Sequence, residues 1–277
     1  MKIIYTDKCL EYNGRPESPE RVKKTYQLLE EKGYQFTEPE PASEEQIRQV
    51  HTENHIRRIE SGDFFDMDTP AWNNIYEFAK LSAGGAVKAQ EVEGFSLMRP
   101  PGHHAGENGT ALGAPTLGFC YFNNIAIAVA DSDEKTLIID IDGHHGNGTQ
   151  EIFQGSDSVV YLSLHRYPHY PGTGTESKDN YINYPLSGDT RDEKYLEKLD
   201  EGIERALEMQ NYEQVAVSAG FDSYDNDLAS LALSESCFTE IGERIDELGK
   251  PTFVVLEGGY GDISRRVYNF LTGLESA

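Results

Sequence analysis

The chain has 277 residues, and its 24 basic and 48 acidic side chains give a formal net charge of −24. Proteins bind nucleic acids and anionic lipid surfaces mainly through Lys and Arg, so this charge excludes unaided binding to either. No apolar stretch approaches the roughly 20 residues that span a bilayer, and the N-terminus lacks the apolar core of a signal peptide, which predicts a cytoplasmic protein.

The three cysteines, Cys9, Cys120 and Cys237, lie far apart without a CxxC spacing, which argues against a disulfide framework or a structural zinc knuckle. The acid excess predicts an acidic surface that suits cationic partners. Two explanations of it remain open: a high-salt cytoplasm that screens the self-repulsion, or a surface that is simply solubilising. Because no linker divides the chain, we expect one domain over residues 1–277.

Apolar runs alternate with segments of helical period, which is the pattern of βα units that build a parallel sheet. In chain order the sequence predicts a strand at 3–5, helices at 19–32 and 75–92, strands at 94–99, 136–141 and 159–164, a helix at 193–209, a strand at 215–219, a helix at 234–248 and a strand at 252–256. Ser234 is the predicted N-cap of the last helix. Residues 166–180, rich in Tyr, Pro and Gly, predict a long functional loop.

Polar residues accompany each of the five longer strands. In chain order they are His103 and His104, then Asp140, Asp142 and His144, then Ser163, Asp222 and Tyr260. Ligands bind outside the carboxyl ends of parallel strands, so we expect these groups to converge on one crevice.

The spacing of two carboxylates and an imidazole predicts a metal site. An extended chain would send Asp140, Asp142 and His144 to one face. Asp142 and His144, closed by Asp222, would form an open site with three protein ligands, as catalytic Zn²⁺ requires, although Fe²⁺, Mn²⁺ or Co²⁺ would also fit. The alternative is that these residues form buried salt bridges. A single Asp–His pair would favour that alternative, but so many Asp and His residues at strand ends do not. The pattern is less like the Asp-x-His-x-Asp spacing of a binuclear manganese site.

His103 and His104 are the natural proton carriers, because imidazole titrates near neutrality. Asp140 is predicted to orient one ring and Asn147 the other, and a neutral Asn would leave its histidine the less cationic of the two. Tyr260 follows two glycines, which would let the backbone aim its phenol into the crevice as a donor to a developing oxyanion.

Taken together, these motifs resemble the zinc-dependent histone deacetylase family, most closely its class II and acetylpolyamine amidohydrolase-like members. The segments that carry the resemblance are Arg99-Pro-Pro-Gly-His-His-Ala, Gly118-Phe-Cys-Tyr-Phe-Asn-Asn, Asp140-x-Asp-Gly-His-His-Gly-Asn-Gly-Thr-Gln, Pro171-Gly-Thr-Gly, Ser218-Ala-Gly-Phe-Asp and Glu257-Gly-Gly-Tyr. It runs from Glu17 to Tyr260. The resemblance implies an arginase/deacetylase α/β fold, with a mostly parallel sheet of about eight strands flanked by helices.

The resemblance also implies an activity and a set of site residues. The reaction would be hydrolysis of an acetylated amine, usually acetyl-lysine, to acetate and free amine. Zn²⁺ would be held by Asp142, His144 and Asp222, with His103 and His104 moving protons and Tyr260 polarising the acetyl carbonyl. The implied substrate contacts are Phe119 and Tyr170 as tunnel walls, the Gly118 carbonyl and a rim carboxylate at Asp68. Asp140, Ser163 and the Leu164 carbonyl would bind a monovalent cation such as K⁺.

The chain departs from the family pattern at several positions. The usual Gly-Asp-Pro is missing after Asp222, Tyr170 stands where the family often has Phe, and His169 has no clear counterpart. This chain has no Glu at the position that marks dedicated polyamine deacetylases, so polyamine specificity is not predicted. The leading hypothesis is a deacylase of acetyl-lysine or small acetylated amines. The alternatives are an acetylpolyamine or other small-amide hydrolase, and a non-catalytic acyl-lysine-binding module, which would not need Tyr260 or the histidine pair.

Overall fold

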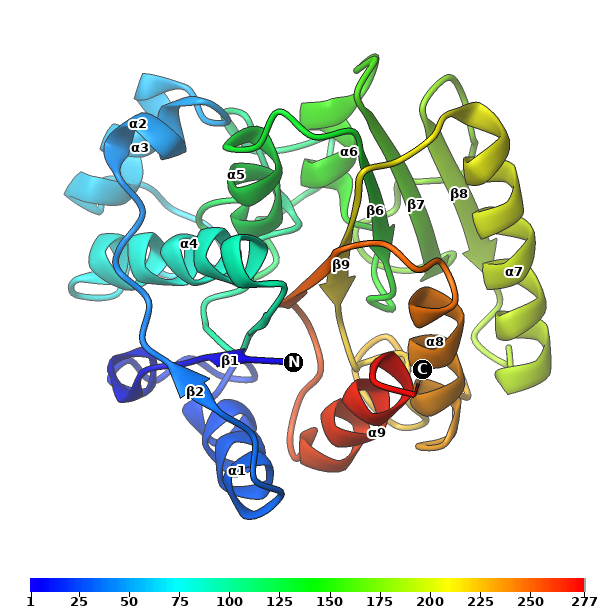
Figure 1. Ribbon diagram of the computed structural model, residues 1–277. Helices are drawn as coiled ribbons and strands as arrows, with labels where there is room; N and C mark the ends of the chain where they lie inside the picture. Colours follow the sequence, from blue (N-terminus) through cyan, green and yellow to red (C-terminus); the bar gives the residue numbers. More distant parts are fainter. Residues whose placement is uncertain (277) are drawn as a thin grey trace.

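Eight parallel strands form one sheet in the computed structural model, which describes residues 1–276 (Figure 1). Their spatial order is β2 (Phe36–Thr37), β1 (Ile3–Ile4), β3 (Phe95–Ser96), β10 (Thr252–Leu256), β9 (Gln214–Ala219), β6 (Thr136–Asp140), β7 (Val159–Arg166) and β8 (Tyr181–Leu186). A small antiparallel pair, β4 (Ala105–Gly106) and β5 (Gly109–Thr110), stands apart. The predicted parallel sheet of about eight strands is therefore confirmed.

Helices cover both faces of this sheet, because alternate strand residues are buried in different cores. In β6, Leu137 and Ile139 belong to one apolar cluster and Ile138 to the other. The first cluster takes side chains from α1 (Pro19–Glu31), α7 (Asp192–Met209), α8 (Cys237–Asp246) and α9 (Ser264–Leu274). The second takes them from α2 (Glu44–Arg48), α3 (Glu53–Ser61), α4 (Ile75–Val92), α5 (Asn124–Ala130) and α6 (Asn147–Phe153). A short 3₁₀ helix spans Asp7–Leu10. Within residues 1–276, no helix is both long and apolar enough to cross a bilayer.

The predicted elements are present, with shifted ends. The strand expected at 94–99 is reduced to β3, and the one expected at 136–141 ends at Asp140. The last predicted helix starts later than expected, at Cys237, although the Ser234 hydroxyl accepts the Cys237 N–H at 3.3 Å. Strands β2 and β8 and the short helices were not predicted. As expected, no helix or named strand lies between β7 and β8, the region of the predicted loop.

Three neighbouring strands end level with one another and so place their following residues at one edge of the sheet. Leu256 of β10 pairs with Ala219 of β9, and Ser218 of β9 pairs with Asp140 of β6. The residues that follow each of these strands therefore begin at the same edge of the sheet, as expected for parallel strands. This edge carries the candidate site.

Candidate metal centre and cavity

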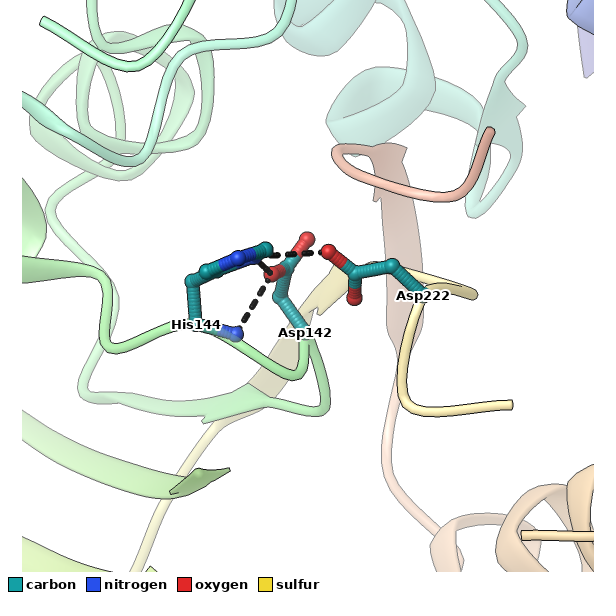
Figure 2. A group of neighbouring side chains, drawn as sticks. All are labelled: Asp142, His144 and Asp222. Atoms are coloured by element: carbon teal, nitrogen blue, oxygen red, sulfur yellow. Dashed lines mark hydrogen bonds and ion pairs between the residues drawn. The ribbon is translucent and has the colours of Figure 1, made fainter. Parts of the chain in front are cut away.

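Asp142, His144 and Asp222 meet beyond the ends of β6 and β9 (Figure 2). Their candidate ligand atoms all lie within 4.8 Å of one another. The Nδ1 atom of His144 is 3.2 Å from Asp142 Oδ1 and 2.7 Å from Asp222 Oδ2. All three residues are buried. The structure thus brings together the three residues that the sequence predicts as metal ligands.

Backbone amides hold the two carboxylates in place. Gly258 N–H donates to Asp142 Oδ2 at 2.7 Å, and Gly143 N–H donates to Asp222 Oδ1 at 2.8 Å. A Cβ atom at Gly258 would collide with Asp142 Oδ2, so only glycine lets the backbone approach this closely. Outer hydrogen bonds of this kind orient metal ligands and leave their inner atoms free for an ion.

The donor set fits a divalent cation. Asp222 Oδ2 is buried and accepts no hydrogen bond from residues 1–276, although His144 Nδ1 lies near it. Two buried carboxylates side by side need a positive charge between them. Burial opposes protonation of His144, but Asp222 and Asp142 outweigh it and raise the pKa of this imidazole to about 10. One nitrogen and two carboxylate donors suit Zn²⁺ and related ions.

The extended-chain argument for this motif was wrong in one respect. Strand β6 ends at Asp140, and the chain then bends through residues 142–144. Asp142 N–H donates back to Asp140 Oδ1 at 3.1 Å, and His144 N–H donates to Asp142 Oδ1 at 2.8 Å. Because strand alternation stops at Asp140, that carboxylate lies outside the cluster of candidate ligands.

Asp140 instead lies beside His103, one of the two histidines that it was predicted to orient. Its Oδ2 atom lies 3.1 Å from His103 Nδ1 and accepts the Tyr161 hydroxyl at 2.8 Å. Burial disfavours the cationic ring, but Asp140 and Asp142 outweigh it and raise the pKa of His103 to about 10. His103 also lies close to the candidate ligands, with its Nε2 atom 3.9 Å from Asp142 Oδ1.

Asn147 lies beside His104, the other histidine of the pair. Its Oδ1 atom lies 2.7 Å from His104 Nδ1, and its Nδ2 atom donates to the Ala111 carbonyl at 2.9 Å. That second bond fixes the amide orientation, so His104 Nδ1 must donate and Nε2 keeps its lone pair. Burial and the positive charges of His103 and His144 hold the pKa of His104 well below its usual value. The pKa of His104, which faces the neutral Asn147, is thus lower than that of His103, which is the expected direction.

A cavity of about 290 Å³ opens above these groups. It is lined by His104, His144, Tyr260, Gly118, Phe119, Tyr170, Asp68, His169 and Leu228. Seven of these nine are residues that the sequence selects for the metal, for proton transfer or for the substrate. His103 does not line it, which separates the two histidines by position as well as by pKa.

Tyr260 lines this cavity from the irregular segment after β10. Its ring lies edge-on to Phe119, with ring centroids 5.8 Å apart, and the Arg21 guanidinium is 5.4 Å from its centroid. Arg21 Nε also donates to the Gly259 carbonyl at 2.6 Å. Burial and the charge of Asp222 raise the pKa of Tyr260 well above its usual value, so the phenol keeps its proton.

The other predicted site residues are placed as follows. Asp68 lines the cavity, but its carboxylate already accepts the Thr116 hydroxyl at 2.6 Å and Gly118 N–H at 3.1 Å. The Gly118 carbonyl accepts the Cys120 thiol at 3.4 Å. Asp140 and Ser163 are register partners in β6 and β7, and Leu164 follows Ser163. These residues are adjacent, and their binding of K⁺ stays a prediction.

Sequence reasoning gave no role to three residues around the site. Glu257 Oε2 accepts Gly102 N–H at 2.7 Å and His103 N–H at 3.1 Å, and burial raises its pKa to about 7. His169 and Leu228 line the cavity from irregular segments. The Glu257-Gly-Gly motif was a sequence signal that could have pointed to Glu257. For His169 and Leu228 the sequence gives no signal beyond their place in loop segments.

The chain is similar to proteins of known family and fold. Residues 15–273 match the family model described as "Histone deacetylase domain". A probable deacetylase of Archaeoglobus fulgidus is 36% identical over 93% of this chain and 80% of its own length. Acetylpolyamine amidohydrolase 1 of Pseudomonas aeruginosa is 34% identical over 77% of this chain and 66% of its own length. The crystal structure of the HDA15 HD domain aligns with a TM-score of 0.88 and 29% identity over 99% of this chain and 88% of that chain, which confirms the predicted fold.

Proposed function

The chain belongs to the histone deacetylase family, and from this premise we propose that it is a metal-dependent amidohydrolase. It would remove acetyl, or a related small acyl group, from the amine of acetyl-lysine or a similar acetylated amine and release acetate. The observation that carries the proposal is the convergence of Asp142, His144 and Asp222 beneath a cavity lined by Tyr260 and His104. That combination supplies a metal site, a phenol and a proton carrier around one reacting centre.

The metal would be held by Asp142, His144 and Asp222, with Zn²⁺ preferred and Fe²⁺, Mn²⁺ or Co²⁺ also compatible with the donors. When bound, it would supply Lewis acidity, which polarises an acyl carbonyl and lowers the pKa of water. The two carboxylates are held by backbone N–H groups before any ion arrives. Little rearrangement is therefore needed for binding.

The chain's own residues perform the proton transfers. His104 lines the cavity with Nε2 as its free lone pair, so it accepts the proton of the attacking water and later returns it to the leaving amine. The neutral phenol of Tyr260 donates to the carbonyl oxygen as negative charge develops there. His103, which pairs with Asp140 and does not line the cavity, would contribute positive charge when protonated.

The substrate would enter between the rings of Phe119 and Tyr170, which suit an aliphatic amine chain. A net charge of −24 favours cationic substrates, whether basic peptides or small amines. The named activity of the Pseudomonas relative makes an acetylated polyamine the second candidate. An acyl-lysine-binding module without catalysis is the third, and the intact Tyr260 and His104 speak against it.

Turnover of an acetyl-lysine peptide and of N-acetylputrescine by the zinc-loaded protein tests the proposal. Tyr260→Phe keeps the ring but removes the donor, so we expect kcat to fall about 10²-fold or more with metal content unchanged. Tyr167→Phe is the matched control, because Tyr167 is an exposed tyrosine outside the cavity. Binding of both substrates without turnover in the fully metal-loaded parent would favour the binding module, and a marked preference for N-acetylputrescine would favour the polyamine hydrolase.

A further inference from the structure

Two walls of the cavity are joined by one hydrogen bond. Tyr170 comes from the segment between β7 and β8, and Phe119 comes from the segment between β5 and α5. The Tyr170 hydroxyl donates to the Thr116 carbonyl at 3.0 Å, which links positions 54 residues apart. Neither segment is part of a helix or strand, so their relative position depends on contacts such as this one.

We propose that Tyr170 is a positioning residue that uses this bond to hold residues 116–119 and so sets how bulky an acyl amide the cavity admits. The inference rests on the proposed function and deepens it, because it names a residue that selects among substrates. A phenylalanine at this position would supply the same aromatic wall without the bond. The hydroxyl is therefore the part of Tyr170 that carries the proposal.

The segment that Tyr170 holds has an unfavourable backbone. Phe119 has φ of 68° and Gly118 has φ of 56°, and a bulky residue in this left-handed region persists only where its surroundings hold it there. One set of bonds comes from the chain before α4. In it, Leu117 N–H donates to Asp66, Gly118 N–H to Asp68 and Phe119 N–H to the Thr69 hydroxyl, at 3.0, 3.1 and 2.8 Å. The Tyr170–Thr116 bond anchors the same segment to the other wall.

The position of this segment matters because the reacting groups are in direct contact with it. The Tyr170 ring lies edge-on to His104 and His144, with centroid separations of 5.0 and 5.9 Å. A Cβ atom at Gly118 would collide with His104 and lie 2.7 Å from the Tyr170 hydroxyl oxygen. Because Gly118 packs this closely against His104 and Tyr170, a shift of residues 116–119 would change the room beside the reacting carbonyl.

Tyr170→Phe isolates the hydroxyl, and Tyr167→Phe, on the same loop but 38% exposed, is the matched control. The measurement is kcat/KM for an acetyl-lysine peptide and for the butyryl-lysine form of the same peptide, with each protein fully loaded with zinc. We expect the ratio of acetyl to butyryl turnover to fall about three- to tenfold in Tyr170→Phe, as for loss of one hydrogen bond. The control should keep the parent's ratio. An unchanged ratio in Tyr170→Phe would overturn the role in selectivity.

A second measurement does not depend on activity. Amide hydrogen exchange over residues 116–119 should accelerate in Tyr170→Phe and not in Tyr167→Phe, while exchange in β6 and β9 stays as in the parent. Unchanged exchange at 116–119 would overturn the positioning role whatever the kinetics show. If the zinc-loaded parent turns over neither peptide, accelerated exchange still supports the positioning role, and the failure is that of the proposed function.

Discussion

The carboxylate of Asp227 accepts the backbone N–H of Tyr260, at 3.1 and 3.2 Å from its two oxygens. The same carboxylate pairs with Arg266 of α9 at 2.6 Å, and both side chains are almost fully buried. Glycines with positive φ flank Tyr260 on both sides, at Gly259 and Gly261, so the turn has little conformational preference of its own. The Asp227–Arg266 pair therefore fixes where the phenol lies.

Asp227→Asn should lower kcat by about ten- to a hundredfold, because the phenol loses its fixed position while the metal ligands are untouched. Steady-state kinetics and metal analysis of the purified variant provide the check. Asp225→Asn, at an exposed position two residues earlier, controls for the loss of one charge. Loss of metal in proportion to activity would show instead that Asp227 supports the metal centre.

Asn147→Asp should move the acidic limb of the pH–rate profile to higher pH. A carboxylate facing His104 Nδ1 stabilises the imidazolium and so raises the pKa of His104. As pH falls, the base then becomes protonated, and activity is lost, at a higher pH than in the parent. The measurement is kcat/KM across pH with Asn211→Asp, an exposed change of the same charge, as the control. A limb that stays in place would contradict the assignment of His104 as the base.

Removal of metal should lower the midpoint of thermal unfolding. A bound cation relieves the repulsion between Asp142 and Asp222, and binding to the folded state alone adds about 2.7 kcal/mol at a free metal concentration of 100 Kd. Chelation of the parent should therefore lower Tm, and added Zn²⁺ should restore it. In Asp222→Asn the response to Zn²⁺ should be largely lost, whereas Asp225→Asn should respond as the parent does. If neither chelation nor added Zn²⁺ changes the Tm of the parent, the result would contradict the metal site.

Glu17→Gln should destabilise the fold by about 3–5 kcal/mol at pH 7, because it leaves a buried arginine unpaired. Both Glu17 oxygens accept from Arg99 at 2.7 Å, and Arg99 is fully buried. Glu20→Gln, at an exposed position of α1, is the control. Chemical denaturation of the three proteins measures the difference.

The same pair predicts how the difference depends on pH. Burial would raise the pKa of Glu17, but Arg99 and Arg21 outweigh it and hold the pKa below its ordinary value. The contribution of the pair is then complete above the unfolded pKa of about 4.3 and is lost as pH falls through the lower folded pKa. The difference in free energy of unfolding between the parent and Glu17→Gln should therefore be constant near neutrality and shrink in acid.

The sequence predicted the central strands and the meeting of Asp142, His144 and Asp222, because long apolar runs and the geometry of parallel sheets do not depend on loop detail. It missed β8, which lies at the edge of the sheet, mixes buried and exposed residues without regular alternation and includes Pro185. The extended-face argument for Asp140 was wrong because the strand ended two residues before Asp142. The sequence predicted that Asp140 would orient one of the two histidines, and the structure places it beside His103.

The contacts that fix the cavity walls could not be predicted from the sequence. The Tyr170–Thr116 bond and the Asp227–Tyr260 bond join irregular segments 54 and 33 residues apart. Period and spacing carry no information about such segments, because neither strand alternation nor helical repeat applies to them. The family resemblance pointed to Tyr170 as a wall, but not to what its hydroxyl binds.

The order of strands in the sheet has a consequence for when the candidate metal ligands come together during translation. β9 lies between β10 and β6, although about 75 residues of chain separate it from β6. A nascent polypeptide that stops before residue 214 has Asp142 and His144 but neither Asp222 nor the Gly258 amide that orients Asp142. If the protein binds a metal ion, its three candidate ligands are therefore complete only in the last quarter of translation.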